Sequence, residues 1–397
     1  VFGNITTTKS INRYIITDAG AAKVSYTTNL STSINLDGSK SVTVSGVGYT
    51  YSSRGVLSGM YEGGTSLYLL VYEWNKIEGV EDMTVPELKQ KFNLTKTYYT
   101  GTLSYSEDVF GNSSLNNIIN TYDNFGGGIF KPDYTETILL GSYNIDGSTT
   151  TQTKSQKLDY VYRPQEVTWE DGTIHAGFAL AQAYENEQEH GQHGVIETRD
   201  IFGNLTTTTT INTYIVTANG QAKVATSTAT SVSTNIDTST STTVATTNYF
   251  YTDGTEEKGI LPSSKYYDSE GKVYKGNLYR ATGYSETTGR DPFDNPYTVY
   301  TDNIYQIHSE TGKPIVDKSI SLTQATSLDG TTSKSLSIMD YTYDNKAALT
   351  TASNVGTIDD VTSLHYYSEI NIALNEITTG IKKLDPSYIA QSNKNFT

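Results

Sequence analysis

The feature that most constrains this chain is an internal repeat. The segment VFGNITTTKSINRYIITDAGAAKV at residues 1–24 returns as IFGNLTTTTTINTYIVTANGQAKV at residues 201–224, and the match continues to Tyr51 and Tyr251. A chain that repeats itself over such a length builds the same supersecondary unit more than once. We therefore expect a tandem array of similar units.

Weaker copies of the opening motif lie between and after this pair, as DVFGN at residues 108–112 and DPFDN at residues 291–295. Each copy is followed by an acidic turn and then by a Tyr-x-Tyr pair. The turns hold Asp37, Asp146, Asp237 and Asp329, and the pairs are Tyr49 and Tyr51, Tyr160 and Tyr162, Tyr249 and Tyr251, and Tyr341 and Tyr343. The sequence thus predicts four repeats, at residues 1–107, 108–199, 200–290 and 291–397.

The hydrophobic pattern inside a repeat is that of β-strands. Val24, Tyr26, Leu30, Ile34 and Leu36 all fall on even positions among polar residues, which is the period of a half-buried strand. Asp37-Gly38 then favours a hairpin turn. We expect a mainly β fold of tandem antiparallel units, either sandwich-like or built of long hairpins, with a few short helical inserts.

A change of parity after the turn predicts an irregularity in the returning strand. Val42 and Val44 lie on even positions but Tyr49 and Tyr51 on odd ones, which predicts a β-bulge near Gly46. The fourth repeat shows the same change, from Leu336 and Ile338 to Tyr341 and Tyr343.

Three segments have helical features. Thr84 and Glu87 have capping-box spacing, which predicts a short helix near residues 84–92. The segment IHAGFALAQAYENEQEH at residues 174–190 is a second candidate. Near the end, Ile370, Leu374, Ile377 and Ile381 fall at helical spacing, although their β-branched side chains leave a strand open.

Composition excludes several classes of function. The net charge of −15 disfavours nucleic acid and anionic lipid surfaces as partners. The lack of cysteine excludes disulfides and thiolate metal sites. No run of about eighteen apolar residues occurs, so no membrane span is expected. Because the chain starts with Val1 in the middle of a motif, we expect that residues have been removed upstream.

The repeated turn motif is interpreted as structural: the Phe would anchor the core, the Gly would permit a positive φ, and the Asn would cap the turn. Its residues are Phe2, Gly3, Asn4, Phe110, Gly111, Asn112, Phe202, Gly203, Asn204, Phe293 and Asn295. Sequons for N-glycosylation are a second class of candidate. They lie at Asn4, Asn29, Asn93, Asn112, Asn204 and Asn395.

Metal and catalytic signals are weak. The segment ENEQEHGQHG at residues 185–194 gathers Glu185, Glu187, Glu189, His190 and His193 without HExxH spacing, and we interpret it as a solvated acidic loop. Calcium is the candidate ion for Asp291, Asp294, Asn295, Asp359 and Asp360, although no EF-hand loop is present. No nucleophile elbow, P-loop or dinucleotide motif occurs. We therefore expect no enzyme activity and no cofactor, while a polysaccharide-degrading carboxylate pair stays open.

Two resemblances bear on function. The segment YTYDNKAALTTASNVG at residues 341–356 resembles the Tyr-Asp repeats of Rhs-type shell proteins, although the other Tyr-x-Tyr pairs are followed by Ser52, Arg163 and Thr252. The Thr- and Tyr-rich repeats as a whole resemble bacterial surface, S-layer and extracellular filament proteins, which implies self-association without catalysis.

The resulting hypothesis is an extracellular or cell-surface structural protein. Its copies would assemble head to tail into a filament or layer through β-strand pairing, with residues 1–17 completing the sheet of a neighbour. The alternative is a monomeric adhesin or carbohydrate-binding protein in which Tyr side chains contact glycans.

Overall fold

The computed structural model describes residues 5–168, 174–185, 191–256, 266–267, 270–354, 364–366 and 368–371. The chain divides into two compact bodies. The N-terminal body holds residues 1–202, 211–216 and 220–223, and the C-terminal body holds residues 203–210, 217–219 and 224–397.

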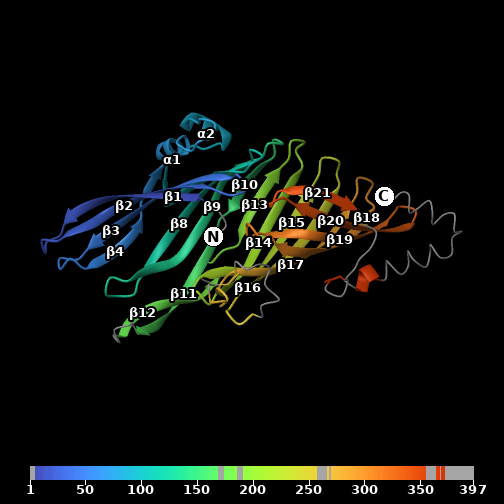
Figure 1. The fold of residues 1–397 in the computed structure, drawn as a ribbon. Helices are drawn as coiled ribbons and strands as arrows, with labels where there is room; N and C mark the ends of the chain where they lie inside the picture. The colour runs from blue at the N-terminus through green and yellow to red at the C-terminus, as the bar shows by residue number, and fades with distance from the viewer. Residues whose placement is uncertain are drawn as a thin grey trace. The chain divides into compact units, whose positions relative to one another are not determined.

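The fold is mainly β, as the sequence predicts, and its strands follow one another in antiparallel hairpins (Figure 1). The first strands are β1 (Ile5–Ile16), β2 (Ala22–Ile34), β3 (Lys40–Tyr51), β4 (Leu57–Glu62), β5 (Gly64–Ser66), β6 (Tyr98–Thr100), β7 (Thr102–Glu107), β8 (Ser113–Asn124), β9 (Phe130–Tyr143), β10 (Thr149–Lys154), β11 (Gln156–Thr168), β12 (Ile174–Tyr184) and β13 (Gly194–Arg199). They are followed by β14 (Leu205–Val216), β15 (Ala222–Thr234), β16 (Thr240–Tyr251), β17 (Leu278–Arg290), β18 (Pro296–Ile307), β19 (Pro314–Thr326), β20 (Thr332–Tyr343) and β21 (Leu349–Asn354). Of the two arrangements left open by the sequence, the structure has the long hairpins.

One turn geometry closes most of these hairpins. In the turn between β2 and β3, the amide of Asn35 donates to the carbonyl of Ser39, and the amide of Gly38 donates to the carbonyl of Asn35. Gly38 has φ 87°, the left-handed conformation that such a three-residue loop requires. The same pair of hydrogen bonds closes the turns at residues 17–21, 52–56, 108–112, 144–148, 235–239, 291–295, 327–331 and 344–348.

The core of the N-terminal body lies between its sheet and two helices, α1 (Leu67–Trp74) and α2 (Val85–Lys91), inserted between β4 and β7. The predicted capping box is present, since the Thr84 side chain accepts from the Glu87 amide and Glu87 accepts from the Thr84 amide. The helices bury Trp74 against Tyr105, with ring centroids 4.6 Å apart. Figure 1 shows both helices on one side of the strands.

A smaller core forms in the C-terminal body. Ile320, Leu322 and Ile338 on β19 and β20 pack with Leu364 and Ile370. Ile370 lies in a helical turn at residues 368–371, where the sequence left helix or strand open. Leu374, Ile377 and Ile381 lie outside the described residues.

Two expectations are wrong. Residues 174–184 form strand β12 instead of a helix, because they pair with β11. No register shift occurs near Gly46, since β2 and β3 pair regularly through Gly48. The bulge lies instead between Thr50 and Tyr51, and its equivalents lie between Val161 and Tyr162, between Phe250 and Tyr251, and between Thr342 and Tyr343. The Tyr-x-Tyr pairs mark it in each repeat.

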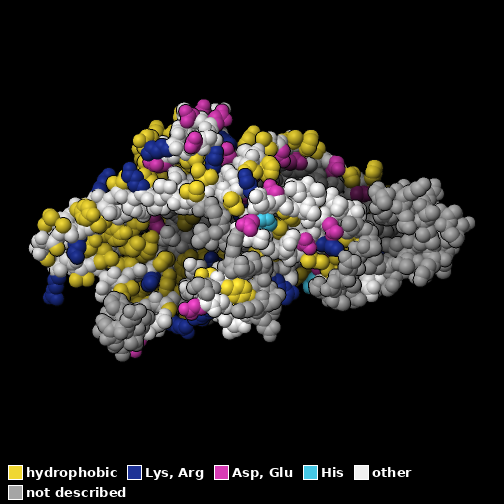
Figure 2. Space-filling view, viewed as in Figure 1, with side chains coloured by type: hydrophobic (Ala, Val, Ile, Leu, Met, Phe, Trp, Pro, Cys, Tyr) yellow, Lys and Arg dark blue, Asp and Glu magenta, His cyan; other side chains and the backbone are white. Residues whose placement is uncertain are grey.

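Much apolar surface is left uncovered. Figure 2, drawn from the same side as Figure 1, shows hydrophobic side chains gathered where β2, β3 and β4 lie. Tyr61 on β4 and Val56 before it are each 50% exposed. Among the described residues, no helix is long and apolar enough to cross a membrane.

Candidate functional site

Each repeat contributes a strand with the motif Asn-x-Tyr and, after the Tyr-x-Tyr bulge, a strand that we call the Leu strand because it places a Leu opposite the second Tyr of that pair. The Asn-x-Tyr pairs are Asn12 and Tyr14 on β1, Asn120 and Tyr122 on β8, Asn212 and Tyr214 on β14, and Asn303 and Tyr305 on β18. The Leu strands are β4 with Leu57, β12 with Leu180, β17 with Leu278 and β21 with Leu349, and each of these Leu residues lies opposite the second Tyr of the pair.

A glutamate at the end of β4 clamps the second Asn-x-Tyr pair. The Oε1 atom of Glu62 accepts hydrogen bonds from Asn120 Nδ2 at 2.6 Å and from the Tyr122 hydroxyl at 3.1 Å. Burial and the neighbouring Glu62 carboxylate raise the pKa of Tyr122, so the phenol keeps its proton. The carboxylate therefore ties the Leu strand of one repeat to the first strand of the next.

Glu185, directly after β12, repeats this clamp with more contacts. Its Oε1 accepts from Asn212 Nδ2 at 2.9 Å, from the Tyr214 hydroxyl at 2.6 Å and from Gln156 Nε2 at 2.5 Å. Its Oε2 accepts from the Asn212 amide at 3.1 Å and lies 3.3 Å from His193 Nδ1. Glu185 is 4% exposed, so these partners compensate for the burial of its charge.

The third Leu strand has no carboxylate at this position. Gly283 stands opposite Asn303, and the Tyr305 ring lies over the glycine, where a Cβ atom would come within 2.8 Å of Tyr305 Cε2. Backbone pairing between β17 and β18 and the packing of Tyr305 on Gly283 join these two repeats here.

The fourth Leu strand and the first Asn-x-Tyr strand have no such partner in the part of the chain that the structure describes. In β21, Ser353 pairs with Asp340 as Tyr184 pairs with Asp159, so Asn354 takes the place of Glu185. β1 pairs only with β2, and Tyr14 is 63% exposed.

The repeated Phe-Gly-Asn segments do form turns, but not as expected in every detail. Gly111 and Gly203 have φ of 89° and 93°, which confirms the role of the glycine. Phe110, Phe202 and Phe293 are 66%, 70% and 73% exposed, so their assignment as core anchors is wrong. They lie at turn tips, where no other described residue buries them. Phe2, Gly3 and Asn4 lie outside the described residues.

The asparagines of these turns do more than cap them. Asn112 Nδ2 donates to Asp108 Oδ2, and its Oδ1 accepts from the amide of Ile145 in the next acidic turn. Asn204 Oδ1 likewise accepts from the amide of Ile236. In the fourth copy, Asn295 donates to Asp291. The motif therefore links neighbouring turns of the sheet.

The sequon asparagines and the residues of the acidic loop are the remaining candidates from the sequence. Among the sequon residues, Asn29 accepts from Ser10 across β1 and β2, and Asn93 is exposed with φ 51°. Glycan occupancy stays a prediction. Of the acidic loop, Glu187, Glu189 and His190 lie outside the described residues, as do Asp359, Asp360 and Asn395.

The calcium candidates at residues 291–295 have internal partners. Asp291 accepts from the amides of Phe293 and Asn295, and Asp294 pairs with Arg290 at 3.0 Å. Across the described residues, no three His, Cys, Asp or Glu side chains gather as a metal ion would require.

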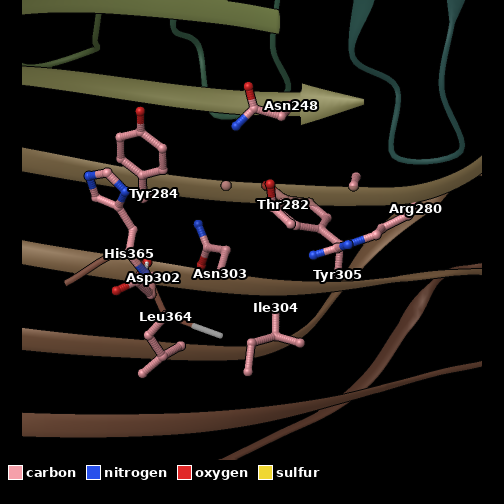
Figure 3. Close-up of a pocket in the computed structure, with 12 residues that line it drawn as sticks. Asn248, Arg280, Thr282, Tyr284, Asp302, Asn303, Ile304, Tyr305, Leu364 and His365 are labelled. Atoms are coloured by element: carbon pink, nitrogen blue, oxygen red, sulfur yellow. Dashed lines mark hydrogen bonds between the residues drawn. The ribbon is translucent and has the colours of Figure 1, made fainter. Parts of the chain in front are cut away.

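A polar pocket of about 420 Å³ lies over β16, β17 and β18 in the C-terminal body (Figure 3). Its walls include Asn248, Arg280, Thr282, Tyr284 and His365. The His365 ring stacks on the Tyr284 ring with centroids 3.6 Å apart and planes at 8°.

A buried aspartate fixes this wall. Asp302, which is 3% exposed, accepts from the backbone amides of His365 and Tyr366, each at 2.8 Å. Burial, together with the carboxylates of Glu286 and Asp302, raises the pKa of Tyr366 to about 12. One end of the pocket is therefore electronegative.

Sequence reasoning missed both the clamp and the pocket. A signal for the clamp is present, because Tyr61-Glu62 and Tyr184-Glu185 end equivalent strands. No family model matches the chain, and no curated protein matches it.

Proposed function

We propose that this chain is an extracellular or cell-surface structural protein whose copies assemble head to tail by β-strand pairing. The supporting observation is the exposure of two strands: β1 pairs with β2 and β21 pairs with β20, and every residue of β1 and of β21 is exposed. In this proposal, β21 of one copy pairs with β1 of the next.

The character of β1 favours such pairing. Every residue of this edge strand is exposed, and its large apolar side chains include Ile5 at 65%, Tyr14 at 63% and Ile16 at 72%. An exposed strand edge carries unpaired backbone amides and carbonyls, which is a template for another strand. Because Ile5–Ile16 already pairs with β2, β1 would accept a strand from a neighbour and keep its own place.

The internal junction supplies the register. Tyr184 of β12 pairs with Thr213 of β14, and Glu185 follows it to bind Asn212. Transferred to β21 and β1, this register places Ser353 opposite Arg13. Asn354 then lies opposite Asn12, where its Oδ1 can accept from the Asn12 amide group and the Tyr14 hydroxyl.

Charge sets the conditions for assembly. Each copy carries a net charge of −15, so copies repel one another at low ionic strength. Salt near 0.15 M screens charges beyond about 8 Å and weakens this repulsion. Assembly should therefore be measured at physiological salt.

Disulfide trapping tests the proposal directly, because the natural chain has no cysteine. The double variant Arg13→Cys/Ser353→Cys places two thiols opposite each other across the proposed junction. Paired residues of antiparallel strands have Cα atoms about 4.5–5.5 Å apart, within reach of a disulfide. We expect a ladder of covalent oligomers after mild oxidation, seen on non-reducing gels.

The matched control is Lys9→Cys/Ser353→Cys, in which the first thiol is shifted by four residues, or about 13 Å, along β1. It should give little cross-linking. Equal ladders from both variants would show random collision, and monomers from both would refute the head-to-tail pairing. Electron microscopy of the uncross-linked chain then shows whether the product is a filament or a layer.

A further inference from the structure

The pocket over β16 to β18 arises where the third repeat departs from the first. The register places Gly48, Gly59 and Tyr61 of the first repeat at the positions of Asn248, Arg280 and Thr282. In the first repeat, Tyr61 covers Gly48 so closely that a Cβ atom there would lie 2.0 Å from the ring. In the third repeat a smaller Thr replaces this Tyr, and Asn and Arg replace the two glycines.

The second repeat keeps the tyrosine at this position, as Tyr184, opposite Asp159. The fourth has Ser353 opposite Asp340. Gln182 and Thr351 stand at the Arg280 position in these two repeats, so the third repeat alone places a cation here. The turn residues Asp37, Asp146, Asp237 and Asp329 recur in all four repeats, whereas these three side chains do not, which is the pattern of a ligand site added to a repeated scaffold.

Asn248 and Arg280 offer hydrogen-bond donors to this pocket. Asn248 Oδ1 already accepts from the Thr226 hydroxyl at 2.9 Å, which leaves the Asn248 amide group to donate. The Arg280 guanidinium lies 5.1 Å from the Phe250 ring centroid and forms no ion pair among the described residues. Both Asp302 oxygens accept from backbone amides. A ligand rich in oxygen acceptors would match this set.

The charges are separated along the pocket. Figure 3 shows Arg280 at one end and Asp302 with His365 at the other, with Asn248 and Thr282 between. Guanidinium groups bind carboxylates through two parallel hydrogen bonds. The stacked rings of Tyr284 and His365 add an aromatic wall, which suits the apolar face of a sugar ring.

We propose that this pocket binds a saccharide that carries a carboxylate, a uronic acid unit. The carboxylate lies at Arg280, and the sugar hydroxyls lie toward Asn248, Thr282 and the Tyr284–His365 stack. The volume of about 420 Å³ accommodates one or two sugar units. This inference is independent of the head-to-tail assembly, since it uses residues of neither β1 nor β21.

Titration calorimetry of the full chain with digalacturonate tests the inference. The comparison ligands are galactobiose, its neutral counterpart, and acetate, a carboxylate without a sugar. We expect digalacturonate to bind at least about tenfold more tightly than either, because only it meets both the guanidinium and the hydroxyl-binding groups. Equal binding of galactobiose would refute the carboxylate contact, and equal binding of acetate would refute the sugar contact.

Two variants locate the site. Arg280→Gln should weaken digalacturonate binding at least about tenfold through loss of the charge-assisted contact, whereas Arg290→Gln, on the same strand but outside the pocket, should not. Thr282→Tyr restores the side chain of the first repeat and should abolish binding by filling the pocket. A circular dichroism melt shows that each variant is folded. No binding by the natural chain, or full binding by folded Thr282→Tyr, would overturn the inference.

Discussion

Tyr214 donates its hydroxyl to the buried carboxylate of Glu185 across 2.6 Å, and the same carboxylate binds the side chain and the amide of Asn212. Tyr122 and Glu62 repeat this relationship one junction earlier. The chain thus uses a side-chain clamp, besides the backbone ladder, to fix one repeat on the next. Since a strand can slip in register where its pattern is uniform, such a clamp specifies the pairing.

The two clamps should differ in strength. Glu185→Ala leaves Asn212, Tyr214 and Gln156 without their acceptor, which we expect to cost about 1–3 kcal/mol of unfolding free energy. Glu62→Ala removes the acceptor of two donors and should cost less. Urea denaturation followed by tyrosine fluorescence measures both. Equal midpoints for Glu185→Ala and the natural chain would show that the clamp adds no stability.

The acidic turns predict a loss of stability in acid. Hydrogen bonds from the Ser239 side chain and amide hold the pKa of Asp237 below its usual value, and the Ser148 amide does the same for Asp146. A lowered folded pKa gives stability that is present above the unfolded pKa, near 3.9, and is lost as the pH falls through the folded value. The urea concentration at the midpoint of unfolding should therefore decrease as the pH is lowered below about 4.

Replacing a turn aspartate by asparagine tests whether its titration causes the loss of stability in acid. Asp237→Asn keeps an acceptor oxygen but cannot titrate, so it should flatten the acid limb of the midpoint curve. Glu81→Gln, at an exposed carboxylate outside the repeated turns, is the control and should leave the limb unchanged. An unchanged acid limb in Asp237→Asn would contradict the role of the turn carboxylate.

The turn at residues 235–239 contains a strained residue, and a substitution can relieve the strain. Thr238 has φ 71° at the position that Gly38, Gly147 and Gly330 occupy in the other acidic turns. A positive φ is unfavourable for a β-branched residue, so Thr238→Gly should raise the unfolding free energy by roughly 1 kcal/mol. Thr240→Gly, in the following strand, should lower it. A decrease in Thr238→Gly would mean that the threonine side chain makes a compensating contact.

Much of this fold could be predicted because its determinants are local. The period of two, the turn chemistry of Asp37-Gly38 and the Thr84–Glu87 capping box each act within a few residues. Residues 174–190 are a helix candidate by sequence, but residues 174–184 form a strand because their pairing with β11 overrides the local preference.

The candidate site could not be predicted because it depends on long-range pairing. Glu62 meets Asn120 only when the helical insert between β4 and β7 is looped out of the sheet. The exposed Phe110 shows the same limit, since hydrophobicity alone does not tell whether another layer covers a turn. The pocket is formed by residues that differ among the repeats, whereas a repeat pattern in a sequence reveals only the residues that agree.

The proposed junction can be strengthened as well as broken. Asn354 stands where the internal junction has Glu185, and Glu185 binds the copies of Asn12 and Tyr14 on β14. Asn354→Glu would give β21 the carboxylate of the internal clamp, and hydrogen bonds to a charged acceptor are about twice as strong as neutral ones. The substitution also makes the net charge more negative, so charge repulsion between copies would by itself weaken association.

We therefore expect Asn354→Glu to shift the association midpoint, measured by analytical ultracentrifugation at physiological salt, to a concentration about tenfold lower. Asn12→Ala/Tyr14→Phe should cancel this gain, because the added carboxylate then has no donors on the neighbouring copy. Thr351→Glu, which adds the same charge elsewhere on β21, is the matched control and should not promote association. Weaker association in both glutamate variants would mean that charge repulsion, and not the clamp, governs this edge.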